Sequence, residues 1–197
     1  PDWPGNAALL AAESGCLQKQ KKKKNTITFL GAMNVAHNEA GVIHFIQNIL
    51  PLIKERVPEI QFIVVGGGIT DKLRKYQSKS VRFLGRVEDV RNAVGTCEVF
   101  VCPLTFGSGI KTKNLEAMAM GVPVVTTTIG AENINAINGR DWIIADDNKD
   151  FANAVVELIH DSDRRKNMEE CAFQFVKKYF TWKVAEERLK KCLPNGE

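Results

Sequence analysis

The chain has 197 residues, a formal net charge of +4, 44% hydrophobic residues and 25% charged residues. This length and composition indicate one ordinary globular domain that can bury a core without disulfides, and they exclude a disordered or fibrous protein. No apolar run is long enough to span a bilayer, and no signal-peptide pattern is present. Because the chain begins with Pro1, we expect either a fragment or a processed form of a longer protein.

The first 25 residues are predicted to be an appendage and linker, followed by one domain over residues 26–197. The basic run Lys19–Lys24 within this linker leaves two interpretations open. It is either a solvated, mobile linker or a weak attachment to anionic lipid headgroups, which would give peripheral membrane association. Nucleic acid binding is not favoured, because basic residues elsewhere alternate with acids and no aromatic stacking platform is visible.

From Thr26 onward, apolar runs rich in Val and Ile alternate with segments of helical periodicity. The apolar runs show little polar alternation, as in parallel strands that are covered on both faces. The predicted strands are residues 26–30, 61–66, 81–85, 99–103, 122–127 and 142–146. The predicted helices are residues 38–56, 70–78, 88–95, 111–120, 148–160, 163–178 and 182–192.

These repeated strand–helix–strand units predict an α/β fold with a doubly wound, Rossmann-like parallel sheet in a three-layer α/β/α arrangement. In such a sheet ligands bind at the carboxyl ends of the strands, where the strand order reverses. With an assumed order of 3-2-1-4-5-6, that switch point lies between the first and fourth strands. The loops 31–38 and 103–111 should therefore meet there.

The loop after the fourth strand carries the clearest chemistry. Gly107-Ser108-Gly109 precedes a helix that begins with Lys111 and Lys113, and Glu116 follows them. Unpaired backbone N–H groups at a helix start attract anions, and glycines let a ligand approach closely. Two lysines suit a diphosphate, whereas a carboxylate one turn further along suits sugar hydroxyls. The pattern indicates a binding site for a nucleoside diphosphate that carries a sugar.

The five cysteines are scattered, and no two have the spacing of zinc ligands. Cys97 and Cys102 flank a predicted buried strand, which favours core thiols over a reactive role. We therefore expect a reducing, cytoplasmic environment, with the inner face of the membrane as a further option from the basic run.

A longer comparison of motifs leads to a family. Glu116–Val125 reads EAMAMGVPVV and resembles the Glu-Ala-Met-Ala-x-Gly-x-Pro-Val-Val signature of retaining GT-B glycosyltransferases, which include sucrose and glycogen synthases. The stretch FLGAMNVAHNEAGVIHFIQNILPLI from Phe29 is similar to the opening of this domain in bacterial polysaccharide-assembly members. Matching stretches also occur, in order, at Phe62–Gly68, Val81–Val90 and Tyr179–Leu189, so the resemblance runs from the first predicted strand onward.

The resemblance implies the C-terminal, donor-binding domain of a hexosyltransferase. Such an enzyme transfers a sugar from a nucleoside-diphosphate sugar to a saccharide or lipid-linked acceptor in polysaccharide biosynthesis, with no metal or other cofactor. The acceptor would bind through an N-terminal domain that this chain lacks. We therefore expect the isolated chain to be inactive in transfer.

The resemblance also implies roles for single residues. Glu116 would hold the two ribose hydroxyls and Lys111 the diphosphate, with Lys113 the weaker choice for that contact. The backbone at Arg86 and Val87 would meet the base. The other predicted donor-binding residues are Asn34, Asn38, Gly67, Ser108, Gly109, Ile110 and Thr112.

The chain departs from the family at three places. Ser108 replaces a glutamate near the donor sugar, and Ala32-Met33 and His37-Asn38 replace an arginine and a lysine of the first loop. Asn38 is equally well interpreted as a helix N-cap. Arg86 is equally well interpreted as part of a surface salt bridge, and Glu116 has the alternative of a first-turn charge that complements the helix dipole.

Two other function classes stay open on the sequence. The replacements favour a non-catalytic module that binds nucleotide or a partner protein. A non-hydrolysing nucleotide-sugar epimerase shares the fold but needs acidic and histidine groups that are scarce here. His44 fits a packed helix position, whereas His37 lies in the first loop. Gly66-Gly67-Gly68 fails the dinucleotide fingerprint, because Asp71 stands where a third glycine is required.

Overall fold

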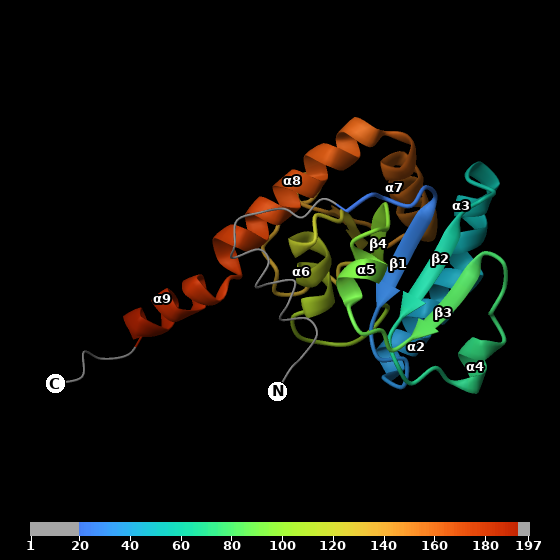
Figure 1. The fold of residues 1–197 in the computed structure, drawn as a ribbon, viewed down its shortest axis with the longest axis horizontal. Coiled ribbons are helices and arrows are strands. Elements are labelled where there is room, and N and C mark those ends of the chain that lie inside the picture. The colour runs from blue at the N-terminus through green and yellow to red at the C-terminus, as the bar shows by residue number, and fades with distance from the viewer. Residues whose placement is uncertain (1–19, 193–197) are drawn as a thin grey trace.

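The computed structural model describes residues 20–192 and has a six-stranded parallel sheet at its centre (Figure 1). Along the sheet the strands follow the order β3-β2-β1-β4-β5-β6. Their bounds are β1 Thr26–Leu30, β2 Gln61–Val65, β3 Val81–Gly85, β4 Val99–Cys102, β5 Val124–Thr126 and β6 Ile143–Ile144. The predicted fold class and strand order are confirmed, so the switch point lies between β1 and β4.

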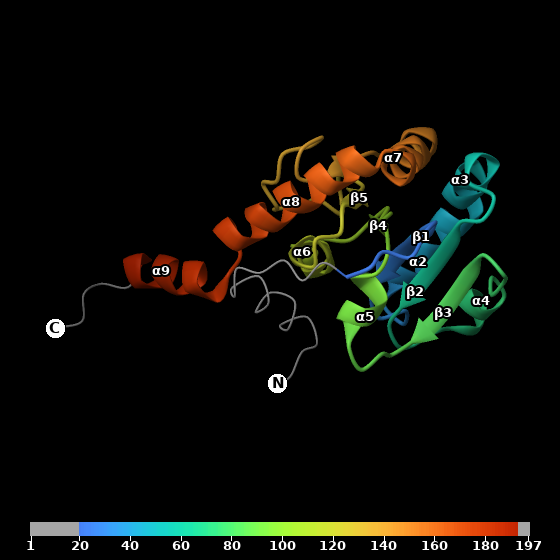
Figure 2. The ribbon, with the colours of Figure 1, turned by 45° about the horizontal axis from the view of Figure 1, so that its top comes forward.

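Helices cover both faces of the sheet, which gives the predicted three layers (Figures 1 and 2). One layer holds α2 Ala36–His44, the π-helical turn η1 Phe45–Ile49, α3 Leu50–Arg56 and α7 Asn148–His160. The other holds α5 Val90–Val94, α6 Thr112–Ala119 and α8 Ser162–Tyr179. The short helix α4, Asp71–Arg74, joins β2 to β3, and α9, Trp182–Cys192, follows α8.

The core explains why the strands lack polar alternation. All four residues of β4 are buried, because this central strand is covered by helices on both faces. Phe45 of η1 packs against Phe62 of β2 and Phe151 of α7, with ring centroids 4.6 and 6.0 Å apart. These contacts fix the α2–η1–α3 layer on the sheet and so hold the loop after β1 in place.

The predicted helix 38–56 is one helical run, but it contains a π-helical turn and begins two residues earlier, at Ala36. Pro51 follows this turn, near the start of α3. Proline has no N–H to donate, and its ring conflicts with the carbonyl four residues before it. The wider π turn accommodates that conflict, and the chain continues as α3.

Other boundaries also differ from the sequence pattern. The helix predicted over residues 70–78 is helical only over Asp71–Arg74, capped by the hydroxyl of Thr70. The strands predicted over residues 122–127 and 142–146 shorten to the three residues of β5 and the two of β6. β6 lies at the sheet edge and pairs only with β5, so few ladder bonds define it.

The basic run at the start of the domain is only partly solvated. Lys21, Lys23 and Lys24 are exposed, but Nζ of Lys22 donates to the carbonyls of Gly95 and Gly121 at 3.2 and 3.1 Å. The Lys22 ammonium also lies 3.9 Å from Glu169 of α8, and burial lowers the pKa of Lys22. The solvated-linker interpretation is therefore wrong for this lysine.

The cysteine prediction is confirmed for two thiols, since Cys97 and Cys102 are both free and buried. Burial raises the pKa of Cys97 to about 11, which keeps this thiol protonated and unreactive. No helix within residues 20–192 has the length and apolar character needed to cross a membrane.

The last helix stands apart from the rest. In Figures 1 and 2, α9 projects away from the body of the domain beyond the end of α8. Phe180, just before it, packs on the core, whereas Trp182 is 56% exposed. The side chain of Leu189 lies outside the part that the structure describes.

Candidate functional site

The two loops at the switch point meet as the strand order requires. His37, in the first turn of α2, lies against Gly107 in the loop after β4. A Cβ atom placed on Gly107 would be 3.5 Å from Cγ of the imidazole. The loop residues 105–110 are exposed, so this edge of the sheet is accessible to a ligand.

The start of α6 has the geometry of an anion site. Gly107 and Gly109 have φ values of +120° and +80°, a region that side chains disfavour, so the loop turns sharply before the helix. Lys111 is the N-cap residue, and its side chain does not cap the helix. Ser108, Ile110 and Thr112 are all exposed around this helix start, which supplies N–H groups and the positive end of the dipole.

Lys111 is buried, with only 5% of its surface exposed. Its Nζ donates to the carbonyl of Gly109 at 2.6 Å and lies 3.6 Å from a carboxylate oxygen of Glu132. These contacts turn the ammonium back onto its own loop. Lys111 therefore shapes the glycine turn and adds positive charge beside it.

Lys113 reaches across to the other loop, which the sequence pattern did not predict. Its Nζ donates to Oδ1 of Asn38 and lies 4.4 Å from the ring centroid of Phe29 at the end of β1. A Cβ atom on Gly31 would be only 2.8 Å from this ammonium. A cation borne by α6 thus occupies the first loop, where the family resemblance places an arginine. Burial lowers the pKa of Lys113, and the nearby Glu116 carboxylate partly offsets this by favouring the charged ammonium.

Asn38 does not cap a helix, because α2 begins at Ala36 and its N-cap residue is Val35. The N-cap interpretation of Asn38 is therefore wrong. The buried Asn38 amide instead donates to the carbonyl of Ala32 at 2.9 Å and accepts from Lys113. The Asn38 side chain ties the loop after β1 to the helix α6.

Glu116 lies in the second turn of α6 and is 4% exposed. α6 has no acidic residue in its first turn, so the alternative role as a first-turn dipole partner is wrong. Glu116 and Lys113 are three residues apart and share a face of the helix. The buried Glu116 carboxylate lies near the Lys113 ammonium, one turn beyond the open start of α6.

The loops after β2 and β3 form the adjoining wall of the site. A Cβ atom on Gly68 would be 2.8 Å from Oδ1 of Asn34, and the carbonyl of Gly67 accepts from the backbone of Met33 at 2.7 Å. Gly67 in turn lies beside the Cβ atom of Arg86. Asn34, Gly67 and Arg86 are thereby brought together, and Val87 follows Arg86 in the same loop.

Arg86 is exposed and forms no ion pair with any residue in the described part of the chain. The interpretation of Arg86 as a surface salt bridge therefore lacks a partner among residues 20–192. The guanidinium is available to stack on or bind a ligand at this wall.

The other histidine of this region is structural. Nε2 of His44 lies 2.9 Å from Oδ1 of Asn148 at the start of α7, and Nδ1 lies 3.2 Å from the amide of Asn48. Both ring nitrogens are thus used, Nε2 between α2 and α7 and Nδ1 within the α2–η1 run, in agreement with a packing role. Within residues 20–192, no group of three or more His, Cys, Asp or Glu side chains is arranged to hold a metal ion.

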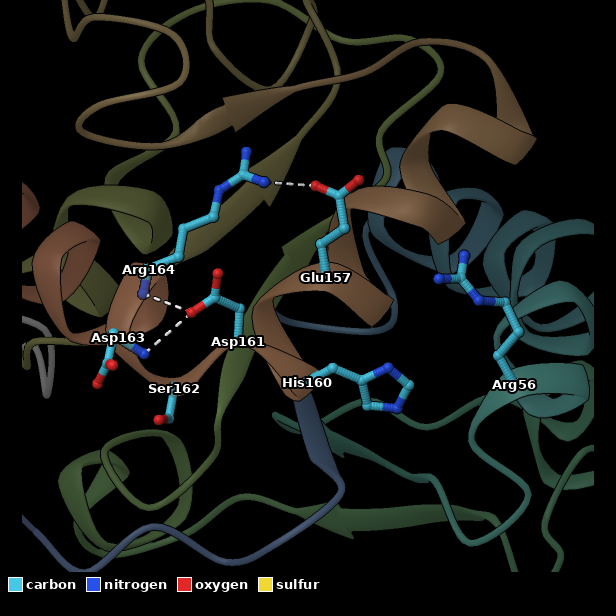
Figure 3. Close-up of a pocket in the computed structure, with 7 residues that line it drawn as sticks. All are labelled: Arg56, Glu157, His160, Asp161, Ser162, Asp163 and Arg164. Carbon is cyan, nitrogen blue, oxygen red and sulfur yellow. Dashed lines mark hydrogen bonds and ion pairs between the residues drawn. The ribbon is translucent and has the colours of Figure 1, made fainter.

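A pocket of about 490 Å³ lies at the far end of the molecule, between the ends of α3 and α7 and the start of α8 (Figure 3). Several of its polar groups already have structural partners. Asp161 accepts from the backbone N–H groups of Asp163 and Arg164 as the N-cap of α8, and Arg164 pairs with Glu157. This pocket is therefore a helix junction, and the loops at the switch point are the candidate site.

Known proteins resemble this chain in sequence or in fold. The mannosyltransferase of Corynebacterium glutamicum described as GDP-mannose-dependent monoacylated alpha-(1-6)-phosphatidylinositol monomannoside mannosyltransferase is 28% identical over 157 residues, covering 73% of the chain and 41% of the relative. This chain therefore spans less than half the length of that curated relative.

Two solved structures show the same fold. TarM from S. aureus, crystallised with UDP among its ligands, superposes with a TM-score of 0.74 at 16% identity, covering 89% of this chain and 36% of TarM. The C-terminal domain of LpcC from Francisella tularensis, a glycosyl transferase group 1 family protein, gives a TM-score of 0.68 at 18% identity, covering 87% and 92% of the two chains.

These likenesses identify the fold as that of a GT-B C-terminal domain. At the level of sequence, residues 24–161 match the family described as Glycosyl transferases group 1. The match includes the whole candidate site, from the loop after β1 to Glu116. The chain belongs to the glycosyl transferases group 1 family.

Proposed function

We propose that this chain is the donor-binding half of a retaining glycosyltransferase, which moves a sugar from a nucleoside-diphosphate sugar to a saccharide or lipid-linked acceptor in polysaccharide biosynthesis. One observation carries the proposal. The open start of α6 and the crossing ammonium of Lys113 lie at the switch point, and the buried carboxylate of Glu116 lies near that ammonium.

Each of these groups suits a different part of the donor. The α6 start and the two lysines suit the diphosphate, because oriented N–H groups and cations stabilise its negative charge. Glu116 suits the ribose, because the two oxygens of a carboxylate can accept hydrogen bonds from two neighbouring hydroxyls. Arg86 and Val87 border the place left for the base, and Asn34 and Asn38 line the approach from β1.

In the transfer step, negative charge develops on the departing diphosphate as the bond to the sugar breaks. Cations and N–H groups that are already in position lower the energy of that charge. We propose no metal or other cofactor for this role. The acceptor would enter from an N-terminal domain of the parent protein, and the buried free thiols support a reducing, cytoplasmic location.

The first test is the class of nucleotide that binds. We expect the chain to bind UDP or GDP more tightly than the matching monophosphate, and both more tightly than NAD. The expectation follows from the anion site at α6 and from Asp71, which would repel a dinucleotide at the glycine loop. Isothermal calorimetry with UDP, UMP, GDP, GMP and NAD measures it. Equal affinity for mono- and diphosphates, or a preference for NAD, would contradict the proposal.

The second test is turnover. We expect no acceptor-dependent sugar transfer from the 197-residue chain alone, because its site residues all serve the donor and the GT-B relatives are longer. An assay of labelled sugar transferred from UDP-glucose or GDP-mannose to added oligosaccharides measures this activity. Robust transfer by this chain would refute the half-enzyme proposal. A parent protein that binds donor but never transfers it would favour the non-catalytic module.

A further inference from the structure

His37 is the one histidine at the junction of the two site loops. Its imidazole lies against Gly107 and is half-buried there. Neither ring nitrogen forms a hydrogen bond with any residue that the structure describes, whereas both nitrogens of His44 are used. A titratable group with two free nitrogens therefore faces the place where an anion would lie.

The charges around His37 are positive. Lys113 and Lys111 face it from α6 and its N-cap, and together with burial, the larger cause, they hold the pKa of His37 below its ordinary value. The nearby carboxylates have cationic or hydroxyl neighbours of their own. Glu132 pairs with Lys111, Glu116 lies near Lys113, and Glu39 accepts from Thr70 and pairs with Lys72.

We propose that His37 takes up a proton from solvent when the diphosphate of the donor enters between the two loops, so that donor binding tightens as pH falls. This inference rests on the proposed function. The two negative charges of the diphosphate, within a few ångströms of His37, would raise its pKa and outweigh the effect of the lysines, because an opposite charge favours the protonated imidazole. The proton resides on a ring nitrogen, where it makes His37 a charged hydrogen-bond donor to the diphosphate.

The direction of the pH dependence follows from linkage. The pKa of His37 is lowered in the free chain and raised in the complex, so the complex binds one more proton between these two values. Affinity is constant above the pKa of the complex, rises as pH falls through the interval, and levels off below the pKa of the free chain. Each unit between the two values strengthens binding by up to about tenfold.

Calorimetry with UDP-glucose and GDP-mannose tests this directly. These donors are used because the terminal phosphate of a free nucleoside diphosphate titrates near about pH 6 itself. Titrations in PIPES and in imidazole, whose ionisation enthalpies differ, count the protons taken up. We expect proton uptake near neutrality and binding about three- to tenfold tighter at pH 6 than at pH 8.

Two variants make the assignment specific. His37→Gln should still bind donor, but with no proton uptake and no change between the two pH values. His160 lies in the helix-junction pocket of Figure 3, remote from the two loops, so His160→Gln should show the same proton uptake and pH dependence as the wild type. Donor binding without proton uptake, or proton uptake that persists in His37→Gln, overturns this inference and leaves the proposed function standing. Failure to bind any nucleoside diphosphate or nucleoside-diphosphate sugar overturns both this inference and the proposed function.

Discussion

Replacing Glu116 by Gln is expected to weaken UDP or GDP binding by about tenfold or more. A hydrogen bond to a charged group contributes about 1.5–3 kcal/mol, and Gln keeps the shape of the side chain while removing its charge. Calorimetry of both proteins with UDP and with 2′,3′-dideoxy-UDP measures the effect. The dideoxy nucleotide should bind the two proteins equally, because it lacks the ribose hydroxyls whose hydrogen bonds the substitution weakens.

Glu157→Gln is the matched control for this substitution. Glu157 is also a glutamate on a helix with a cationic partner, but it pairs with Arg164 in the pocket remote from the loops. It should leave UDP affinity unchanged. If the losses caused by Glu116→Gln and by the dideoxy ligand simply add, Glu116 does not hold the ribose.

The largest expected effect on stability is that of Gly66→Ala. Gly66 has a φ of +135°, and a Cβ atom there would lie 1.9 Å from the carbonyl oxygen of Gly31. The substitution combines backbone strain with a collision between the ends of β1 and β2, so we expect a loss of about 3 kcal/mol in unfolding free energy. Thermal unfolding should then occur roughly 6–12 °C lower.

Gly67→Ala provides the control in the next position of the chain. A Cβ atom on Gly67 would meet only the Cβ atom of Arg86, at 3.9 Å, and its φ is not positive. Its unfolding temperature should change little. Equal destabilisation by the two substitutions would show that the close approach at Gly31 does not determine the effect.

Much of the fold could be predicted because each local signal agrees with the global arrangement. Strands covered on both faces are continuous Val and Ile runs, as β4 shows, and glycines mark the turns at their ends. The π turn could not be predicted from periodicity, since Pro51 changes the backbone bonding without interrupting the apolar pattern. The strand predicted over residues 142–146 is longer than β6, because this edge strand forms a ladder with β5 over only two residue pairs, which the apolar pattern does not reveal.

The site divides in the same way. The motif placed Lys111 and Glu116 on one loop and helix, because they are close in sequence. The bond between Lys113 and Asn38 joins residues 75 positions apart, and it exists only because β1 and β4 are neighbours. The family resemblance favours Lys111 over Lys113 for the phosphate contact. The structure shows that Lys113 is the lysine that links the two loops.

The contacts of Lys22 bear on how this domain should be cut for experiments. Its ammonium joins two loop carbonyls and a helix carboxylate, although it precedes the first strand by four positions. A truncation that starts at Thr26 would remove this cation and break its ion pair with the buried Glu169, which is costly in a low-dielectric interior. For protein engineering, the functional start of the domain therefore lies within the lysine run, at or before Lys22.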